Sequence, residues 1–415
     1  MPAPIAPTVA SVIDPTGSSI GITAYDGSKA GPPDAKVTVH IRSVDALRHA
    51  VTAPGSLGLA RAFVSGSLDL DGDPYEFLQM VSEAKLGAVS WRERLSVLRE
   101  LGPTVLRPLA PPPEEAPSRW RLGLRHAQRR DAVAISHHYD VSNRFYEMVL
   151  GPTMAYTCAV YPTLDSTLEE AQIEKVDLVC RKLGLKPGMR LLDVGCGWGT
   201  MVRHAAKEYG VKALGVTLSK AQADWAAEAI EREGLSDKAE VRFSDYREVR
   251  ESGFDAISSI GLTEHIGKAK FAAYVRHLQI LLKPQGRLLN HCITRPSGHE
   301  SAIHKRGFIS RYAFPDGELL SPGFIVSGLH DNGFEVRHEE NFREHYAMTL
   351  RDWCANLDRN WDACVAEAGL GRAKVWALYM AGSRLGFDEN RIQLHQVLAV
   401  KTTNGRSGMP LRQDW

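Results

Sequence analysis

Two side chains capable of acid–base chemistry follow neighbouring predicted strands. Glu264 comes after the predicted strand 255–260, and His291 lies at the end of the next one, 286–293. Because the carboxyl ends of parallel strands meet at one edge of a sheet, we expect the carboxylate and the imidazole to lie close together. Such a pair could exchange protons with a substrate or cradle an anion. Each residue also has a plainer interpretation, since Glu264 could cap the next helix and His291 could be a satisfied buried histidine.

A glycine-rich turn earlier in the chain predicts a nucleotide-binding site. Residues 191–194 form a short apolar strand that runs into Gly195, Gly197 and Gly199, and a helix is predicted over 199–209. A strand, a glycine turn and a helix make the first unit of a nucleotide-binding α/β sheet, in which the glycines leave room for a ligand against the backbone. The spacing is not Gly-x-Gly-x-x-Gly, and a glycine turn alone is weak evidence.

The next two strands discriminate between cofactors. Residues 211–219 end in Gly-Val-Thr-Leu-Ser, without the acid that holds a ribose hydroxyl in a dinucleotide-binding domain, which counts against NAD. Asp193, before the glycine turn, and Asp245, after the predicted strand 239–243, instead fit the pattern of S-adenosylmethionine (SAM) methyltransferases. A structural turn without any ligand is the plainer alternative.

The elements that must position these residues alternate between strand and helix, which predicts the α/β class with a Rossmann-like class I SAM methyltransferase domain. Strands are expected near 190–195, 211–217, 239–243, 255–260 and 286–293, with a closing pair at 334–339 and 393–401. Helices are expected at 168–183, 199–209, 219–233, 268–282, 348–369 and 371–385. An insertion at 294–330 with many apolar side chains interrupts the alternation, and it would receive a substrate over the carboxyl ends of the strands.

The chain divides into three segments. The pattern of residues 1–107 predicts a small, mostly helical domain, with strands near 19–23 and 36–42. Residues 108–135 combine a proline-rich linker with a basic segment that suits either an anionic membrane surface or a solvated helix face. The methyltransferase domain follows over 136–415. The basic segment contains Arg119, Arg121, Arg125, Arg129 and Arg130.

The composition narrows the classes of partner and location. The 415 residues carry a formal net charge of +1, which gives no whole-chain reason to expect nucleic acid. No apolar run reaches the roughly 18 residues of a membrane span, and the first residues lack signal-peptide features, so we expect a cytoplasmic protein. No metal is expected, because the six cysteines show no zinc-site spacing: Cys158, Cys180, Cys196, Cys292, Cys354 and Cys364.

Several motifs occur together in a specific order. They are His-His-Tyr-Asp from His137, Tyr-Thr-Cys-Ala from Tyr156, the glycine turn, Val-Thr-Leu-Ser from Val216, Glu-His-x-Gly from Glu264, and Ile-Ser-Arg-Tyr-x-Phe-Pro from Ile309. In these motifs the chain resembles the cyclopropane fatty acid synthases and related mycolic acid methyltransferases. The similarity extends from about Ser136 to Lys401, and more faintly from Gly55 to Asp71.

The resemblance implies two bound groups. SAM would lie on the glycine turn and under the Tyr-Thr-Cys segment, near Tyr156, Thr157, Asp193, Gly195, Gly197, Trp198, Thr217, Leu218, Gln222, Asp245 and Tyr246. A bicarbonate ion would be held in the active site by Cys158, Glu264, His291, the backbone of Ile293, and Tyr346. Cys158 would then be an ion ligand and not a nucleophile.

The implied reaction is transfer of the SAM methyl group to a cis double bond in a phospholipid acyl chain, through a carbocation with bicarbonate as the base. The enzyme would act peripherally at the inner face of the membrane, and a homodimer and a partner reductase are compatible with this picture. The resemblance also implies that the domain 1–107 handles lipid or supports dimerisation, and that the insertion 294–330 binds the acyl chain. Loss of a proton from the added methyl group gives a cyclopropane, and loss from the chain gives a methylene or methyl branch. The chain departs from the family pattern at Ser142, Arg144, Leu262, Thr263 and Cys292. These departures surround the place where the cation's fate is decided, and we slightly favour the branched product.

Two other functions are compatible with parts of the sequence. The same fold could methylate a small polar acceptor, but the apolar insertion argues against this because such an acceptor needs no apolar channel. A SAM-sensing or lipid-binding module without catalysis would not need the acid–base residues, all of which are present.

Overall fold

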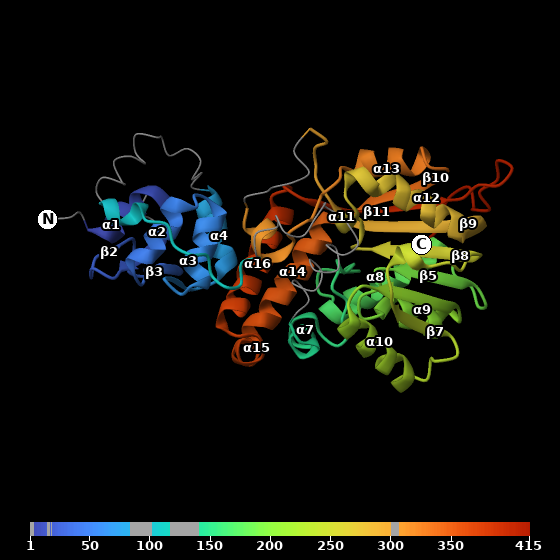
Figure 1. The fold of residues 1–415 in the computed structure, drawn as a ribbon, viewed down its shortest axis with the longest axis horizontal. Coiled ribbons are helices and arrows are strands. Elements are labelled where there is room, and N and C mark those ends of the chain that lie inside the picture. Colours follow the sequence, from blue (N-terminus) through green and yellow to red (C-terminus); the bar gives the residue numbers. More distant parts are fainter. Residues whose placement is uncertain (1–3, 15–16, 18, 84–101, 117–140, 300–306) are drawn as a thin grey trace. The chain divides into compact units, whose positions relative to one another are not determined.

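The chain folds into two compact units in the computed structural model, which describes residues 4–14, 17, 19–83, 102–116, 141–299 and 307–415. The N-terminal unit comprises Met1–Pro117, His304–Pro315 and Trp361–Leu385. The large unit comprises Ser118–Ile303, Asp316–Asn360 and Gly386–Trp415. Figure 1 shows the elements of both units along the chain.

The large unit is organised on one mixed sheet, in which seven strands are found among the described residues, in the order β10-β11-β9-β8-β5-β6-β7. Strands β5 to β9 pair in parallel, while β11 runs antiparallel to both β9 and β10. Their bounds are β5 Arg190–Val194, β6 Lys212–Thr217, β7 Ala239–Phe243, β8 Phe254–Ile260, β9 Leu282–Thr294, β10 Glu335–Asn341 and β11 Gln393–Val400. The strand order reverses between β5 and β8, so a crevice for a ligand is expected at their carboxyl ends.

Helices cover both faces of this sheet. One core packs α8 (Leu168–Leu183), α9 (Thr200–Tyr209) and α10 (Lys220–Arg232) against alternate residues of the strands, such as Leu191, Leu289 and Leu398. The other core packs α12 (Phe271–Leu281) and α13 (Pro322–His330) against the opposite set, such as Leu192, Leu288 and Val397. Burial on both faces accounts for the nearly continuous apolar strands in the sequence. The described part of this unit also contains α7 Asn143–Leu150, α11 Thr263–Ile266 and α14 Arg343–Arg359.

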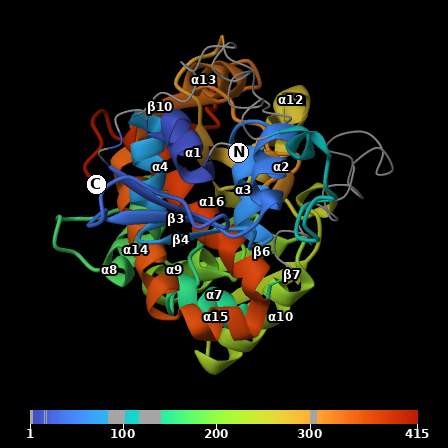
Figure 2. The same ribbon diagram turned by 90° about the vertical axis from the view of Figure 1, so that its left-hand side faces the viewer.

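The N-terminal unit combines helices with a small sheet of order β2-β1-β3-β4 (Figures 1 and 2). The strands are β1 Ile20–Ala24, β2 Lys29–Ala30, β3 Val37–Ile41 and β4 Leu68–Asp71, and more residues lie in helices than in strands. The helices are α1 Ile5–Ile13, α2 Val44–Thr52, α3 Ser56–Val64, α4 Pro74–Glu83, α15 Trp361–Ala368 and most of α16 Leu370–Asp388, with short turns at η2 Pro103–Leu106 and η6 Ile309–Ala313.

One buried carboxylate joins three distant segments of the N-terminal unit. Glu115 has a fully buried side chain and accepts two hydrogen bonds from Arg61 of α3, at 2.7 and 2.8 Å. Arg311 donates to the same carboxylate at 2.7 Å from its Nε, and its carbonyl accepts from the Ala116 N–H at 2.8 Å. These contacts attach residues 307–313 to the N-terminal unit.

The division by contacts therefore differs from the sequence-based division. Residues 304–315 and 361–385 group with the N-terminal unit, whereas the sequence assigned both to the domain 136–415. The expected acyl-chain insertion is accordingly shared, because its part from 316 to 330 belongs to the large unit.

Some expectations concern residues outside the described ranges. They include the arginines at 119–130, the motif that starts at His137, and residues 300–306 of the insertion. Among the helices that are described, none is both long and apolar enough to cross a bilayer.

Gly215 of β6 packs so closely against Cys196 and Val202 that a side chain would not fit there. A Cβ on Gly215 of β6 would lie 2.7 Å from Cys196 Sγ and 2.8 Å from a methyl carbon of Val202, which is closer than packed atoms allow. We expect Gly215→Ala to lower the free energy of unfolding by about 1–3 kcal/mol, as overpacked cores do, measured by urea denaturation.

The matched control is Gly323→Ala in α13, where a Cβ would meet nothing within 4 Å. It should leave the free energy of unfolding unchanged or raise it by up to about 1 kcal/mol. Equal stability of the two variants would contradict the packing argument.

Candidate active site

The glycine turn after β5 is held against β6 by backbone hydrogen bonds. The N–H groups of Gly195 and Cys196 both donate to the Val216 carbonyl, at 2.9 and 3.0 Å. Gly195 and Gly197 have φ values of 77° and 54°, in the left-handed region that glycine adopts at little cost. A Cβ on Gly197 would meet nothing within 4 Å, so the backbone at this residue faces open space.

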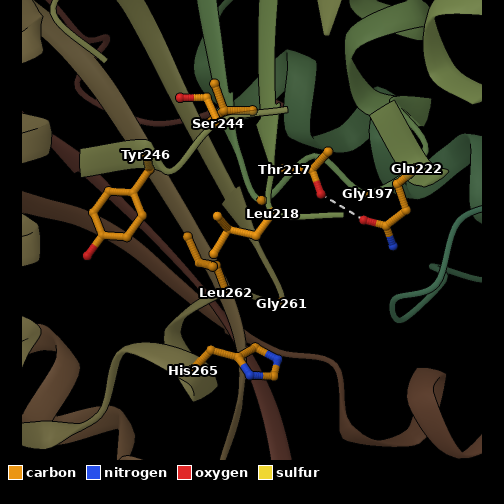
Figure 3. A pocket seen from close by; sticks show the side chains of 11 residues that line it. Gly197, Thr217, Leu218, Gln222, Ser244, Tyr246, Gly261, Leu262 and His265 are labelled. Carbon is orange, nitrogen blue, oxygen red and sulfur yellow. Dashed lines mark hydrogen bonds between the residues drawn. The ribbon is translucent and has the colours of Figure 1, made fainter. Parts of the chain in front are cut away.

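That open space is a cavity at the carboxyl ends of β5, β6, β7 and β8 (Figure 3). The space between its lining residues is about 540 Å³, including the part that is open to solvent. Thr217 Oγ1 donates to Gln222 Oε1 at 2.7 Å on its wall. The lining residues are Gly195, Gly197, Val216, Thr217, Leu218, Gln222, Ser244, Tyr246, Gly261, Leu262 and His265.

Six residues that the sequence assigned to SAM line this cavity: Gly195, Gly197, Thr217, Leu218, Gln222 and Tyr246. Asp193 and Asp245 are buried next to it and are engaged elsewhere. Asp193 accepts from Ser258 Oγ at 2.6 Å, and Asp245 forms an ion pair with Arg247 at 2.5 Å. Burial raises the pKa of Asp193 to about 6.

Five lining residues were not among the predicted ones: Val216, Ser244, Gly261, Leu262 and His265. Ser244 follows β7 directly, and Gly261 and Leu262 follow β8. The rule that ligands bind beyond strand ends would have identified these three residues. His265 is adjacent to Glu264 in the same short helix, α11.

Glu264 is placed by α11, which begins three residues after β8 ends. Its Oε1 accepts a hydrogen bond from the Ile293 backbone N–H at 2.7 Å. Its Oε2 is buried and has no hydrogen-bond partner among the described residues. Burial raises the pKa of Glu264 to about 7, so protonated and ionised forms are both accessible near neutral pH.

His291 lies on β9, opposite Ile260 of β8. Its Nδ1 is 3.2 Å from Gln396 Nε2, while its Nε2 is buried without a partner in the described part of the chain. Burial lowers the pKa of His291 well below its ordinary value, which favours the neutral imidazole.

The structure brings Glu264 and His291 to the same edge, as their strand positions predicted. The Gly261 N–H donates to the His291 carbonyl at 2.8 Å. Ile293, whose N–H Glu264 accepts, is two residues beyond His291 and therefore on the same face of β9.

Cys158 and Tyr346 both contact one backbone carbonyl, that of Phe342, just before α14. The carbonyl of Phe342 accepts from the Tyr346 N–H at 3.1 Å and lies 3.8 Å from Cys158 Sγ. Burial raises the pKa of the Cys158 thiol far above its ordinary value, which favours the protonated form of the sulfur. No direct hydrogen bond joins Cys158 to Glu264 within the described ranges.

Thr157, the residue before Cys158, contacts the buried side chain of Lys175. Lys175 of α8 is only 3% exposed, and its Nζ donates to Thr157 Oγ1 at 3.0 Å. Burial lowers the pKa of Lys175 to about 8, opposed by the charge of Asp193. Thr157 also packs on the cavity wall, because a Cβ on Gly261 would lie 3.2 Å from its methyl carbon.

A continuous row of aromatic rings leads away from the glycine turn. Its consecutive ring centroids are separated by 4.6, 5.8, 5.4, 6.1 and 4.5 Å. At its start Trp198 Nε1 also donates to Asn143 Oδ1 at 2.8 Å. The row consists of Trp198, Tyr146, Tyr156, Trp353, Tyr346 and Phe387. Such faces can stabilise a cation in a place that water does not reach.

Comparison with known proteins agrees with this geometry. The model of the mycolic acid cyclopropane synthetase family matches residues 126–397. A probable fatty acid methyltransferase of Mycobacterium tuberculosis is 54% identical over 402 residues, covering 95% of this chain and 94% of the relative. A probable fatty acid methyltransferase of Pseudomonas putida is 37% identical over 386 residues, covering 91% of each chain.

A solved structure extends the agreement to the fold. A mycolic acid cyclopropane synthase complexed with S-adenosylhomocysteine (SAH) and CTAB is 34% identical, with a TM-score of 0.61. The match covers 65% of this chain and 98% of that chain. These findings confirm the Rossmann-like class I fold and SAM as the methyl donor that were predicted from the motifs. The protein is a SAM-dependent methyltransferase, and the chain belongs to the mycolic acid cyclopropane synthetase family.

Proposed function

We propose that this enzyme transfers the methyl group of SAM to a cis double bond in the acyl chain of a phospholipid. The observation that carries the proposal is the aromatic row from Trp198 at the glycine turn to Tyr346 and Phe387. A polar acceptor with its own oxygen or nitrogen nucleophile would need no such surface. An alkene does, because its attack on a sulfonium methyl group leaves a carbocation.

The electron balance of this reaction defines what the site must supply. The π electrons of the alkene form a bond to the methyl carbon, the carbon–sulfur bond breaks, and SAH leaves with that electron pair. One alkene carbon is then a cation. The reaction ends when a nearby base removes a proton and the C–H electrons form a ring or a new double bond.

The buried acid–base residues fit a small anion that could serve as this base. Glu264 Oε2 and His291 Nε2 are both buried and lack partners among the described residues. Each atom is therefore available for a hydrogen bond with a ligand. We propose that they hold bicarbonate, with Cys158 and Tyr346 nearby. The sequence comparison implied that the Ile293 N–H contacts the ion. In this structure that N–H donates to Glu264 Oε1. Bound bicarbonate would supply an exchangeable base, whereas a carboxylate side chain in its place could be methylated permanently.

We propose a methyl- or methylene-branched product, with a cyclopropane as the alternative. Support comes from the two relatives described above, both named as probable fatty acid methyltransferases and both similar over more than nine-tenths of this chain. The family model and the solved relative are named for cyclopropane synthesis, and they match about two thirds of the chain.

Lipid analysis tests the substrate class. Cells that express the protein and receive oleate should contain phospholipids whose acyl chains have gained one CH₂, measured by mass spectrometry. NMR of the isolated lipid should then show a branch and no cyclopropane ring. Activity on a soluble polar acceptor with none on phospholipid would refute the proposal.

Replacing the candidate acid tests its part in the chemistry. Glu264→Gln keeps the shape but removes the ionisable group, so we expect kcat/KM on oleoyl phospholipid vesicles to fall by about 100-fold or more. The affinity for SAM, measured by calorimetry, should stay within about twofold of the parent, because Glu264 is not among the residues that line the cavity.

The matched control is Glu228→Gln on the exposed surface of α10, which should leave both quantities unchanged. If Glu264→Gln kept its activity, Glu264 would have no part in proton transfer or anion binding.

The raised pKa of Glu264 also predicts how stability changes with pH. Between its unfolded value of 4.5 and its folded value of about 7, the folded protein binds more protons than the unfolded chain. This carboxyl therefore lowers the free energy of unfolding as the pH rises through that window. In bicarbonate-free buffer, Glu264→Gln should gain stability relative to the parent between pH 5 and pH 8, by about 3 kcal/mol at most. A constant difference between the two urea denaturation curves would argue against a raised pKa.

A further inference from the structure

Glu340, Gln396 and His291 lie in one row, side by side on three neighbouring strands of the large sheet. Glu340 of β10 pairs with Gln396 of β11, and Gln396 pairs with His291 of β9. Residues opposite each other on adjacent strands point to the same face. Because Leu289 and Leu398 belong to the core that includes α8, this face is the one that α8 covers.

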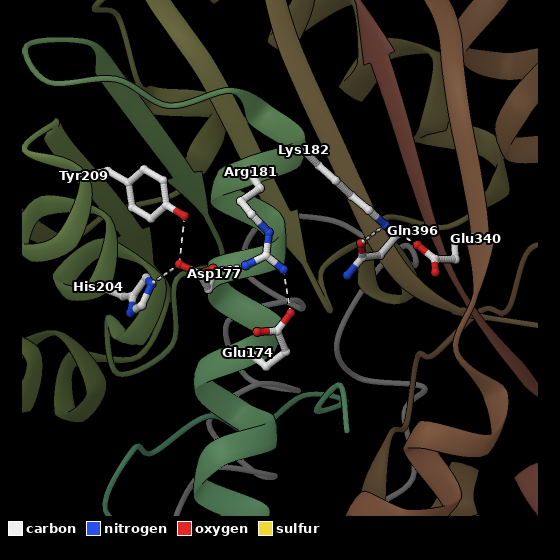
Figure 4. Close-up of polar contacts among 8 residues, drawn as sticks. All are labelled: Glu174, Asp177, Arg181, Lys182, His204, Tyr209, Glu340 and Gln396. Carbon is white, nitrogen blue, oxygen red and sulfur yellow. Dashed lines mark hydrogen bonds and ion pairs between the residues drawn. The ribbon is translucent and has the colours of Figure 1, made fainter. Parts of the chain in front are cut away.

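A lysine from α8 ends on this row (Figure 4). The side chain of Lys182 is fully buried, and its Nζ donates to Glu340 Oε2 at 2.5 Å and to Gln396 Oε1 at 2.7 Å. A buried ammonium group is costly unless it is paired and hydrogen-bonded. Loss of either contact would therefore destabilise the folded protein.

The lysine determines which way the Gln396 amide points. An ammonium group has only donors, so the amide must turn its oxygen toward Lys182. The amide nitrogen then faces His291 Nδ1, at 3.2 Å. Because that nitrogen can only donate, Nδ1 has to accept, and the single proton of the neutral ring is left on Nε2.

We propose that Lys182 and Gln396 are positioning residues that hold His291 in the tautomer with its proton on Nε2. Nε2 is the buried nitrogen without a partner among the described residues, so the neutral ring has a hydrogen-bond donor available for a ligand. That this donor meets the anion rests on the proposed function, whereas the tautomer itself follows from the contacts. A neutral donor suits a basic anion, because an imidazolium ion would protonate the base that it holds.

The tautomer can be observed directly. In full-length protein with ¹⁵N-labelled histidine, two-bond ¹⁵N–¹H correlation spectra distinguish the two neutral tautomers and the imidazolium ion, and His291→Gln identifies the signal. At pH 7.5 we expect the parent His291 to carry its proton on Nε2. A proton on Nδ1, in either the neutral or the charged ring, would overturn the proposal.

Gln396→Glu turns the amide donor into an acceptor of nearly the same shape. The carboxylate can still accept from Lys182, but it would draw a proton onto His291 Nδ1. We expect that proton in the spectrum, together with a fall in kcat/KM of about 10- to 100-fold, as for outer partners of other functional histidines. An unchanged ring signal would overturn the proposal.

Lys182→Met is the second variant, in case Gln396→Glu does not fold. It frees the amide to rotate, so His291 should show a mixture of tautomers and kcat/KM should fall. Lys374→Met is the matched control, because Lys374 is also buried, with a side chain 6% exposed, and it pairs with Asp69 in the N-terminal unit. It should leave the His291 signal unchanged.

Two further measurements separate this proposal from the proposed function. SAM affinity should be unchanged in both variants, because neither residue lines the cavity. In assays at increasing bicarbonate, both variants should need more of the ion for half-maximal rate. If the tautomer shifts as expected but the ion has no effect, the positioning proposal stands and the bicarbonate proposal fails.

Discussion

Excluding water from ionisable side chains is the constraint on which this site depends. The reaction that we propose passes through a carbocation that must be kept from water, yet it also needs groups that bind and move protons. Glu264, His291, Asp193 and Lys175 are accordingly buried or nearly so at the carboxyl edge of one sheet. Burial raises the pKa of the two acids and lowers the pKa of the lysine and the histidine. Near neutral pH the imidazole of His291 is therefore neutral and Glu264 is partly protonated, so these two groups avoid the full cost of a buried charge.

Neutral groups in a dry site have to be oriented, since they lack a strong charge to direct them. The sheet does this with backbone and cross-strand contacts. The Ile293 N–H fixes one oxygen of Glu264, and Gln396 fixes one nitrogen of His291. In both residues the other polar atom has no hydrogen-bond partner among the described residues. Lys182 reaches Gln396 from α8. In our proposal its contacts with Glu340 and Gln396 orient the His291 ring as well as packing α8 on the sheet.

Much of this arrangement could be predicted from the sequence because it depends on local patterns. The helix expected at 168–183 coincides with α8, and the expected strands placed β5 to β8 to within one residue. The strand-end rule placed Glu264 and His291 together. The unit boundaries depend on contacts between distant segments, and no local pattern encodes the ion pairs of Glu115 with Arg61 and Arg311. The Lys182–Gln396–His291 contacts were missed for the same reason, since their partners are more than 100 residues apart.

The burial of Cys158 has a consequence for the durability of the enzyme. Thiols react with oxidants and electrophiles as thiolates, and the pKa of this one is raised so far that almost no thiolate forms. Its sulfur also lies inside the fold, with no exposed surface. An exposed thiolate in an enzyme that binds a methylating agent would be at risk of alkylation or oxidation during repeated turnovers. The burial that raises the pKa of Cys158 also shields its sulfur from such damage.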